Sequence, residues 1–456
     1  MHFKQVYTPG IAHCSYVIGG NNYCVVVDPA RNVEQYLQIA ASLKLSIRAI
    51  IETHLHADFV SGHAELAAIT GAKIYLSKKA GALFEHIALA DGEEFTIDTL
   101  LFKMLDTPGH TPESSVFIVS DLERGPDPAL VFSGDTLMVG DAGRPDLFPD
   151  IKEELAAKLY HSLRKIEVIG DNVELYPAHG AGSLCGRKLS SKLSSTIGTE
   201  RKYNEALLLH PEPLFIKSFL QGMPEAPDHF SRCSAINRNG AVSTSELPEP
   251  KSLNPAEVLE LLKTHIIVDT RDQLAFSAAH LPGAYCLDLK GNFATFAGWV
   301  LPPNRPLILV LETMQDLAPA LRGLHSVGLD GVVGYLDGGM PAWAACGYYT
   351  TRLESISVSE LKERLDNAEL TLIDTRLQSE WNEFHILNSI HAPTPDLRHR
   401  YAEWTGDKPV AFICNTGSRS ILAASIMLHH NKMKKVINII GGISAWVKAG
   451  LPTVKA

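Results

Sequence analysis

The chain has 456 residues, of which 45% are hydrophobic and 20% are charged, and its formal net charge is −10. This length suggests about three domains. No block of basic residues is present, which argues against nucleic acid as a partner. No apolar run approaches the ~20 residues that a membrane helix needs.

The seven cysteines are scattered and include no CxxC pair, which argues against a disulfide framework. The N-terminus has no basic segment followed by an apolar core, so no signal peptide is predicted. We therefore expect a cytoplasmic protein whose thiols are reduced.

The first part of the chain alternates between predicted strands and helices. A turn at 19–22 joins two strands, and the isoleucine-rich run at 48–52 is typical of a buried strand. In chain order, the expected elements are strands at 16–18 and 23–27, helix 33–43, strand 48–52, helix 63–69, strand 73–76, helix 155–166 and a helical stretch at 190–210. This alternation predicts an α/β sandwich.

Four strand-like runs end in polar residues that can bind a metal. The run 48–52 leads into Thr53-His54-Leu55-His56-Ala57-Asp58, where two imidazoles and a carboxylate occupy alternate positions. The runs 102–105, 130–132 and 173–176 lead into His110, Asp135 and His179. A lone HxH is commonly a solvated histidine pair, but four strand ends that deliver His, His, Asp and His indicate a metal site.

The motifs HxHxD at 54–58, PGH at 108–110, GDT at 134–136 and PAHG at 177–180 occur in an order that resembles the metallo-β-lactamase superfamily. The resemblance covers roughly the first half of the chain and implies an αββα sandwich with metal at one edge, between the sheets. That superfamily includes zinc hydrolases such as glyoxalase II and iron-dependent persulfide dioxygenases, so the residues of the site have to distinguish them.

Phe59 favours a single metal ion. Two-metal members of the superfamily usually have HxHxDH, and Phe59 replaces the last histidine, so Asp58 and His179 are predicted to form only a vestigial second site. His54, His110 and Asp135 would then hold one ion. Two histidines and one carboxylate suit non-haem Fe(II) and O₂ chemistry.

His56 leaves an alternative open, because as a fourth ligand it would suit zinc. In the persulfide dioxygenases the matching histidine lies beside the iron, and the resemblance implies the same for His56. The segment 140–147 also resembles those enzymes more than the hydrolases, and Arg144 within it is a candidate substrate-binding residue. Cys185, in a glycine-rich loop beyond His179, is either a structural thiol or a substrate-binding sulfur acceptor at the mouth of the metal site.

A linker and an internal repeat follow. The polar, proline-bearing stretch 239–250 is typical of a linker. Beyond it, the segments 267–271 and 338–343 recur at 372–376 and 441–446. A period of about a hundred residues is that of a duplicated domain, and each copy is predicted to be a parallel α/β domain. We place the domains at 1–242, 251–350 and 355–456.

Both copies resemble rhodanese domains in their DTR and GGxxAW motifs, over essentially the whole C-terminal half. In the second copy, strand 410–413 runs into Cys414-Asn415-Thr416-Gly417-Ser418-Arg419, which resembles the rhodanese active loop. Inward N–H groups, a helix dipole and Arg419 would favour a thiolate and a bound sulfane anion. Cys414 and Arg419 are therefore candidate catalytic residues, with Asn415, Thr416, Gly417 and Ser418 as candidate substrate-binding residues.

The first copy departs from this pattern. Leu311 stands where the nucleophile is expected, and acidic residues replace the cation. We expect this copy to be a spacer or an interface that does not transfer sulfur.

These features predict a persulfide dioxygenase with thiosulfate sulfurtransferase activity, fused to two rhodanese-like domains of which the last is active. Its expected partners are a small-molecule thiol persulfide, O₂ and thiosulfate or sulfite, with one Fe(II) per chain, and a homo-oligomer is expected. Two alternatives are a zinc thioester hydrolase of glyoxalase II type fused to rhodanese domains and a non-enzymatic sulfur carrier or sensor with a structural metal.

Overall fold

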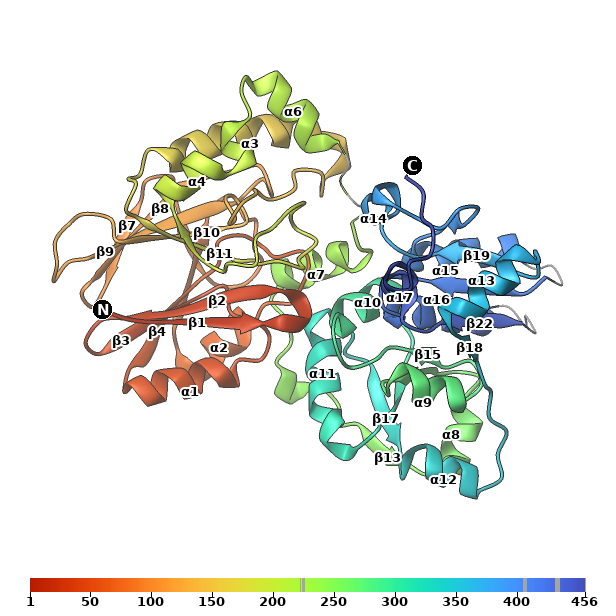
Figure 1. Cartoon of the computed structure of the whole chain (residues 1–456). Coiled ribbons are helices and arrows are strands. Elements are labelled where there is room, and N and C mark those ends of the chain that lie inside the picture. Colours follow the sequence, from red (N-terminus) through yellow and green to blue (C-terminus); the bar gives the residue numbers. More distant parts are fainter. Residues whose placement is uncertain (222, 224–225, 405–407, 431–434, 456) are drawn as a thin grey trace. The chain divides into compact units, whose positions relative to one another are not determined.

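Two six-stranded sheets lie face to face in the N-terminal part of the protein (Figure 1). The computed structural model describes residues 1–221, 223, 226–404, 408–430 and 435–455. The first sheet has the spatial order β1 (His2–Thr8), β2 (His13–Gly19), β3 (Tyr23–Val27), β4 (Ser46–Ile51), β5 (Lys73–Ser77), β6 (Ile87–Leu89). The second has the order β12 (Ser195–Thr196), β11 (Glu174–Pro177), β10 (Leu130–Gly134), β9 (Ser115–Asp121), β8 (Leu100–Asp106), β7 (Glu94–Ile97).

The core between these sheets follows from alternation along the strands. In β8, every second residue from Leu100 onward is buried, so one face of the strand enters the core. Phe102 and Phe132 from the second sheet pack there in one cluster with Tyr16 and Val25 from the first. Burial of these apolar faces holds the two sheets together.

Helices cover the outer face of each sheet. They are α1 (Glu34–Leu43) and α2 (His63–Thr70) on the first sheet, and α3 (Lys152–Glu167), α4 (Ile197–Tyr203), α5 (Glu205–Leu208) and α6 (Glu212–Leu220) on the second. Helix α3 buries Leu155, Leu159, Leu163 and Ile166, a spacing that places them on one face. The predicted αββα sandwich is confirmed.

The helical stretch predicted at 190–210 is confirmed only in part, since helices cover 197–203 and 205–208. The structure has β12 followed by two short helices, because Thr196 and Asn204 each accept a backbone N–H bond and so begin a new helix. Helix α7 (His229–Asn239) was not predicted from the sequence.

The second half contains two five-stranded sheets with the same strand order. One is β13 (Lys251–Leu253), β17 (Val332–Leu336), β16 (Leu307–Val310), β14 (Ile266–Asp269), β15 (Tyr285–Cys286). The other is β18 (Glu354–Ile356), β22 (Val436–Ile439), β21 (Val410–Ile413), β19 (Thr371–Asp374), β20 (Ile390–His391). All the pairings are parallel, which confirms the duplicated parallel α/β domain.

Helices flank the strands in both copies. Those of the first copy are α8 (Pro255–Leu261), α9 (Gln273–Ala278), α10 (Phe293–Val300), α11 (Leu317–Ser326) and α12 (Gly339–Ala345). Those of the second are α13 (Val358–Asp366), α14 (Gln378–Glu383), α15 (Leu397–Arg400), α16 (Ser418–His430) and α17 (Gly442–Lys448). Among the described residues, no helix is both long and apolar enough to cross a membrane.

The chain divides into two compact units. The first is Met1–Leu247 together with His325–Gly328, and the second is Pro248–Leu324 together with Leu329–Ala456. Both copies of the repeat thus belong to one unit, where the backbone N–H of Cys286 donates to Ser425 Oγ at 3.0 Å. The Tyr285 and His429 rings also pack with centroids 4.5 Å apart.

We expect Phe102→Ala to destabilise the first unit by about 3–5 kcal/mol, because it removes a fully buried ring and leaves a cavity. All five tryptophans lie beyond residue 298, in the second unit, so their fluorescence follows that unit alone. In urea, the circular dichroism transition should move to lower denaturant while the fluorescence transition stays. Phe148→Ala, at a ring that is 38% exposed, is the control. Equal shifts of both transitions in Phe102→Ala would contradict separate unfolding of the units.

Candidate functional site

Three predicted ligands converge at one edge of the first unit. His54, His110 and Asp135 follow strands β4, β8 and β10, and their ligand atoms all lie within 4.8 Å of one another. Asp135 Oδ2 is 3.4 Å from His110 Nε2 and 3.8 Å from His54 Nε2. The carboxyl ends of β8 and β10 share one edge of the second sheet because both strands are antiparallel to β9.

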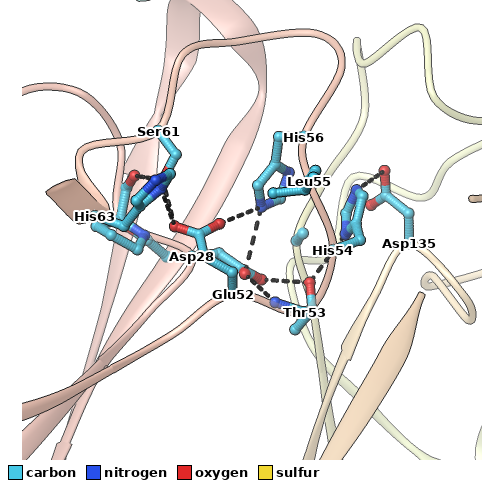
Figure 2. Close-up of polar contacts among 12 residues, drawn as sticks. Asp28, Glu52, Thr53, His54, Leu55, His56, Ser61, His63 and Asp135 are labelled. Carbon is cyan, nitrogen blue, oxygen red and sulfur yellow. Dashed lines mark hydrogen bonds and ion pairs between the residues drawn. The ribbon is translucent and has the colours of Figure 1, made fainter. Parts of the chain in front are cut away.

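The two histidines are oriented by bonds to their other ring nitrogens. His110 Nδ1 donates to the carbonyl oxygen of Arg144 at 2.9 Å. His54 Nδ1 lies 3.0 Å from Thr53 Oγ1, whose own hydrogen goes to Asp28 Oδ2 (Figure 2). Both Nε2 atoms are buried and have no hydrogen-bond partner among the described residues. The lone pairs of these two nitrogens are therefore free to bind a metal ion beside Asp135, as in metal-binding histidines whose other nitrogen is hydrogen-bonded.

Electrostatics match a metal site. Burial lowers the pKa of His54 well below its usual value and also lowers that of His110, which favours the neutral imidazoles that bind metals. Burial opposes ionisation of Asp135, but the neighbouring His179 outweighs it and holds the Asp135 pKa well below its usual value. Two neutral histidines and a carboxylate form a ligand set for a divalent metal ion.

His56 faces away from these three ligands. Its Nε2 lies 3.3 Å from Asp28 Oδ1 and 3.7 Å from Glu52 Oε2 (Figure 2). Burial disfavours the charged ring, but Asp28 and Glu52 raise the His56 pKa overall. Glu52 also accepts a hydrogen bond from Ser61 and lies 3.1 Å from His63 Nδ1. The His56 Nε2 is therefore directed at Asp28 and Glu52 and away from His54, His110 and Asp135.

Phe59 packs among the neighbouring imidazoles. Its buried ring lies with its centroid 4.1 Å from that of His13 and 4.4 Å from that of His56. His13 was not predicted as part of the site, because it belongs to no motif and precedes the others by some forty residues. Its ring nitrogens lie 2.7 Å from the carbonyl oxygen of Asp28 and 3.0 Å from that of Ala178.

His179 sits between two carboxylates. Its Nδ1 is 2.8 Å from Asp135 Oδ1, and its Nε2 is 2.8 Å from Asp58 Oδ2. Burial would lower the His179 pKa, but Asp135 and Asp58 raise it well above its usual value. Asp58 and His179, the residues predicted to form a vestigial second site, lie together with Cys185, and the ligand atoms of all three are within 4.8 Å of one another.

Cys185 and Arg144 lie close to this cluster. Burial, with Asp58 and Asp135 nearby, raises the pKa of Cys185 well above its usual value, so this thiol stays protonated. The Arg144 guanidinium is buried and bonds both carboxylate oxygens of Asp146, at 2.7 and 2.8 Å. It also donates to the carbonyl oxygen of Leu184 at 3.2 Å. Arg144 thereby connects two loops. One is its own loop, whose Arg144 carbonyl oxygen bonds His110, and the other is the loop that contains Cys185.

The predicted cysteine loop joins β21 to α16. Cys414 is buried, and the backbone N–H of Gly417 donates to its Sγ at 3.1 Å. Asn415, Thr416 and Ser418 are exposed. The loop rests on α17, because the backbone N–H groups of Ile443 and Ser444 bond its carbonyl oxygens. Gly442 has φ +57°, and a Cβ there would collide with Cys414 and Asn415, so only glycine permits this approach.

Arg419 is engaged by a carboxylate that the sequence analysis did not identify. Its guanidinium bonds both oxygens of Glu380, at 2.5 and 2.7 Å. Glu380 also accepts the backbone N–H of Leu377, the residue that precedes α14, at 3.0 Å. Arg419 therefore joins the start of α16 to α14, and its charge is shared with Glu380. In the first copy, Leu311 is buried after β16, at the position equivalent to Cys414.

Comparison with protein families agrees with this arrangement. The metallo-beta-lactamase superfamily matches residues 8–179, and the rhodanese-like domain matches residues 254–346 and 357–449. The chain belongs to the metallo-beta-lactamase superfamily and carries two rhodanese-like domains. A crystal structure of a metallo-beta-lactamase from Staphylococcus aureus subsp. aureus COL is similar, with 30% identity, a TM-score of 0.66 and coverage of 73% of this chain and 98% of that one.

Curated relatives include members with two different activities. Mitochondrial persulfide dioxygenase ETHE1 of Bos taurus is 29% identical over 220 residues, which cover 47% of this chain and 78% of the relative. A hydroxyacylglutathione hydrolase of Pseudomonas aeruginosa (strain LESB58) is 33% identical over 158 residues, which cover 34% of this chain and 56% of the relative.

Thr53→Val should weaken metal binding about 10- to 100-fold, because it removes the hydroxyl that orients His54. Competition with a chromophoric chelator, on metal-free protein kept under nitrogen, measures this affinity. Thr70→Val is the matched control, since the Thr70 hydroxyl bonds Leu66 within α2. Unchanged affinity in Thr53→Val would mean that the His54 ring is held by other contacts.

Proposed function

We propose that this protein oxidises a low-molecular-weight thiol persulfide with O₂ to sulfite and the free thiol, and transfers sulfane sulfur at Cys414. The observation that supports the first activity most is the set of His54, His110 and Asp135, with His56 committed to Asp28 and Glu52. The N-terminal half is similar to persulfide dioxygenases, and the C-terminal half contains the rhodanese-like domains. Both findings support the proposal that the two halves act on sulfane sulfur.

His54, His110 and Asp135 would hold one Fe(II) ion per chain, since two histidines and one carboxylate leave coordination positions open. The ion supplies the O₂ redox chemistry that these side chains lack. The chain supplies geometry: Thr53 and the Arg144 carbonyl orient the two imidazoles, and His179 keeps Asp135 ionised.

The overall reaction is RSSH + O₂ + H₂O → RSH + SO₃²⁻ + 2H⁺. The S–S bond breaks, the outer sulfur is oxidised, and O₂ is reduced. All three ligands are at most 2% exposed, so the surrounding protein shields the reacting groups from bulk water. Arg144 is part of the protein that surrounds the ligands, and it positions the loops beside His110 and Cys185. We propose that this positioning is its contribution to substrate binding.

Sulfur transfer needs the Cys414 thiolate. The thiolate attacks the outer sulfur of thiosulfate, the S–S bond breaks, and sulfite leaves with the electron pair, so that Cys414 carries a persulfide. A small thiol then accepts this sulfur as RSSH. The Gly417 N–H lies on Sγ and stabilises the thiolate, while the Arg419–Glu380 pair fixes the start of α16. The reverse direction, from persulfide to sulfite, uses the same groups.

A zinc thioester hydrolase is the second candidate, because hydroxyacylglutathione hydrolases are also among the relatives. Zinc would favour His56 as an additional ligand. The ion pairs of His56 with Asp28 and Glu52 support the first candidate instead.

His110→Ala should remove most bound iron and O₂ uptake together, because only two protein ligands remain. Metal analysis of anaerobically purified protein and O₂ uptake on adding a persulfide measure both effects. His161→Ala, at an exposed histidine on α3, is the control. Full iron and activity in His110→Ala would contradict the ligand set, and zinc with thioester hydrolysis in the unaltered chain would favour the second candidate.

Cys414→Ser should abolish thiosulfate:thiol sulfurtransfer and leave O₂ uptake on a preformed persulfide largely intact. A serine hydroxyl has a far higher pKa than a cysteine thiol and cannot carry a persulfide. Cys346→Ser, at an exposed thiol of the first copy, is the control. Retained sulfurtransfer would point to another thiol, first Cys185. Equal loss of both activities would mean that the persulfide reaches the metal centre only through Cys414.

A further inference from the structure

The first rhodanese-like copy reaches into the active loop of the second. Gln273, the first residue of α9, places its side-chain amide against Gly417, so closely that a Cβ on Gly417 would collide with Gln273 Oε1. This oxygen is buried and has no hydrogen-bond partner among the described residues. A buried acceptor without a hydrogen-bond partner lowers the stability of the fold, so the position of the Gln273 amide requires an explanation.

The residue that Gln273 touches is the one that bonds the nucleophile. Gly417 donates its backbone N–H to Cys414 Sγ at 3.1 Å. Its φ of +116° is open only to glycine, so no side chain of its own fixes Gly417 in place. Neighbouring groups must therefore keep this N–H directed at the sulfur.

The contact is part of a continuous interface along α16, the helix that starts just after Gly417. Further along this helix, Ser425 Oγ accepts the N–H of Cys286 at 3.0 Å, and His429 Nδ1 donates to the carbonyl oxygen of Gly283 at 2.7 Å. Both partners, Cys286 and Gly283, belong to the first copy. Gln273 therefore lies at the end of this hydrogen-bonded interface that is nearest to the Cys414 loop.

The repeat offers an internal comparison. Gln273 follows Asp269-Thr270-Arg271 at the same spacing at which Gln378 follows Asp374-Thr375-Arg376. Gln378 is exposed and bonds Asn382 Oδ1 on its own helix at 2.7 Å. Equivalent glutamines thus have different surroundings, and Gln273 is the one placed against the loop that holds a cysteine.

We infer that Gln273 is a positioning residue for sulfur transfer. Through it, the copy that lacks a nucleophile keeps the Gly417 N–H hydrogen-bonded to the Cys414 sulfur. This inference rests on the proposed function of Cys414. In that reaction the thiolate attacks the outer sulfur of thiosulfate and sulfite leaves with the electron pair of the broken S–S bond. Gln273 exchanges no proton or electron and acts only through Gly417. The charged groups around the loop are the Arg419–Glu380 and Arg376–Asp374 pairs.

The test compares three variants of the full chain: Gln273→Ala, Gln273→Glu and the matched control Gln378→Ala. Gln273→Ala should lower kcat/KM for thiosulfate about 10- to 100-fold, the effect of losing one hydrogen bond to a charged group. Gln378→Ala should stay within about twofold of the unaltered chain, as surface substitutions do. O₂ uptake on a preformed persulfide should be unchanged in all three, and an unchanged tryptophan fluorescence transition in urea shows that the second unit is folded.

A second readout follows Cys414 itself, through the rate of its alkylation by iodoacetamide at different pH values, resolved by peptide mass spectrometry. The midpoint should move to higher pH in Gln273→Ala, because the thiolate loses a held N–H. It should move further, by about one pH unit or more, in Gln273→Glu, because a carboxylate then faces the loop. A residue that only fills space would leave the midpoint of Gln273→Ala at the value of the unaltered chain.

Unchanged kinetics and an unchanged midpoint in Gln273→Ala would overturn the inference, as would equal losses of activity in Gln273→Ala and Gln378→Ala. Absence of thiosulfate sulfurtransfer from the unaltered chain, or its survival in Cys414→Ser, would instead overturn the proposed function. The alkylation midpoints would still report on Gln273, so the two failures are distinguishable.

Discussion

One buried carboxylate, that of Asp28, organises the metal edge of the first unit. Asp28 follows β3 with φ +50° and accepts bonds from both the N–H and the hydroxyl of Thr53. The hydroxyl orients His54 toward the ligand cluster, and the same carboxylate attracts His56 away from it. A single anion thus contacts the groups that orient both members of the HxH pair, and it directs His54 toward the ligand cluster and His56 away from it.

The loop that contains Cys414 is shaped by backbone contacts more than by charges. Gly442 lets α17 approach the loop, and Gly417 turns its N–H to the sulfur. The nearest cation, Arg419, shares its charge with Glu380. Local dipoles and close packing are therefore the main means by which this domain can favour a thiolate. Both sites use the same principle: groups that do not react hold the reacting atoms in place.

Sequence reasoning was strongest where chain order alone brings residues together. Strand ends that share a sheet edge predict that His110 and Asp135 meet, and the repeated motifs predict two parallel α/β domains. It could not identify His13, Glu380 or Gln273, whose contacts join segments far apart in the chain. It also could not show that Asp146 and Glu380 engage Arg144 and Arg419, because a charge in a motif does not reveal its partner. The helical prediction for 190–210 was correct only in part, because the N-caps Thr196 and Asn204 divide the helical pattern into two short helices.

The burial of the three ligands has a consequence for how the centre is assembled. His54, His110 and Asp135 are 2%, 0% and 1% exposed, so an ion held by them would be almost fully enclosed by the folded chain. Binding is then coupled to the closing of the fold, and exchange afterwards is slow. The identity of the ion in a given preparation would then reflect which metals were available while the chain was being made, so the metal content of the growth medium becomes a determinant of the purified protein's composition.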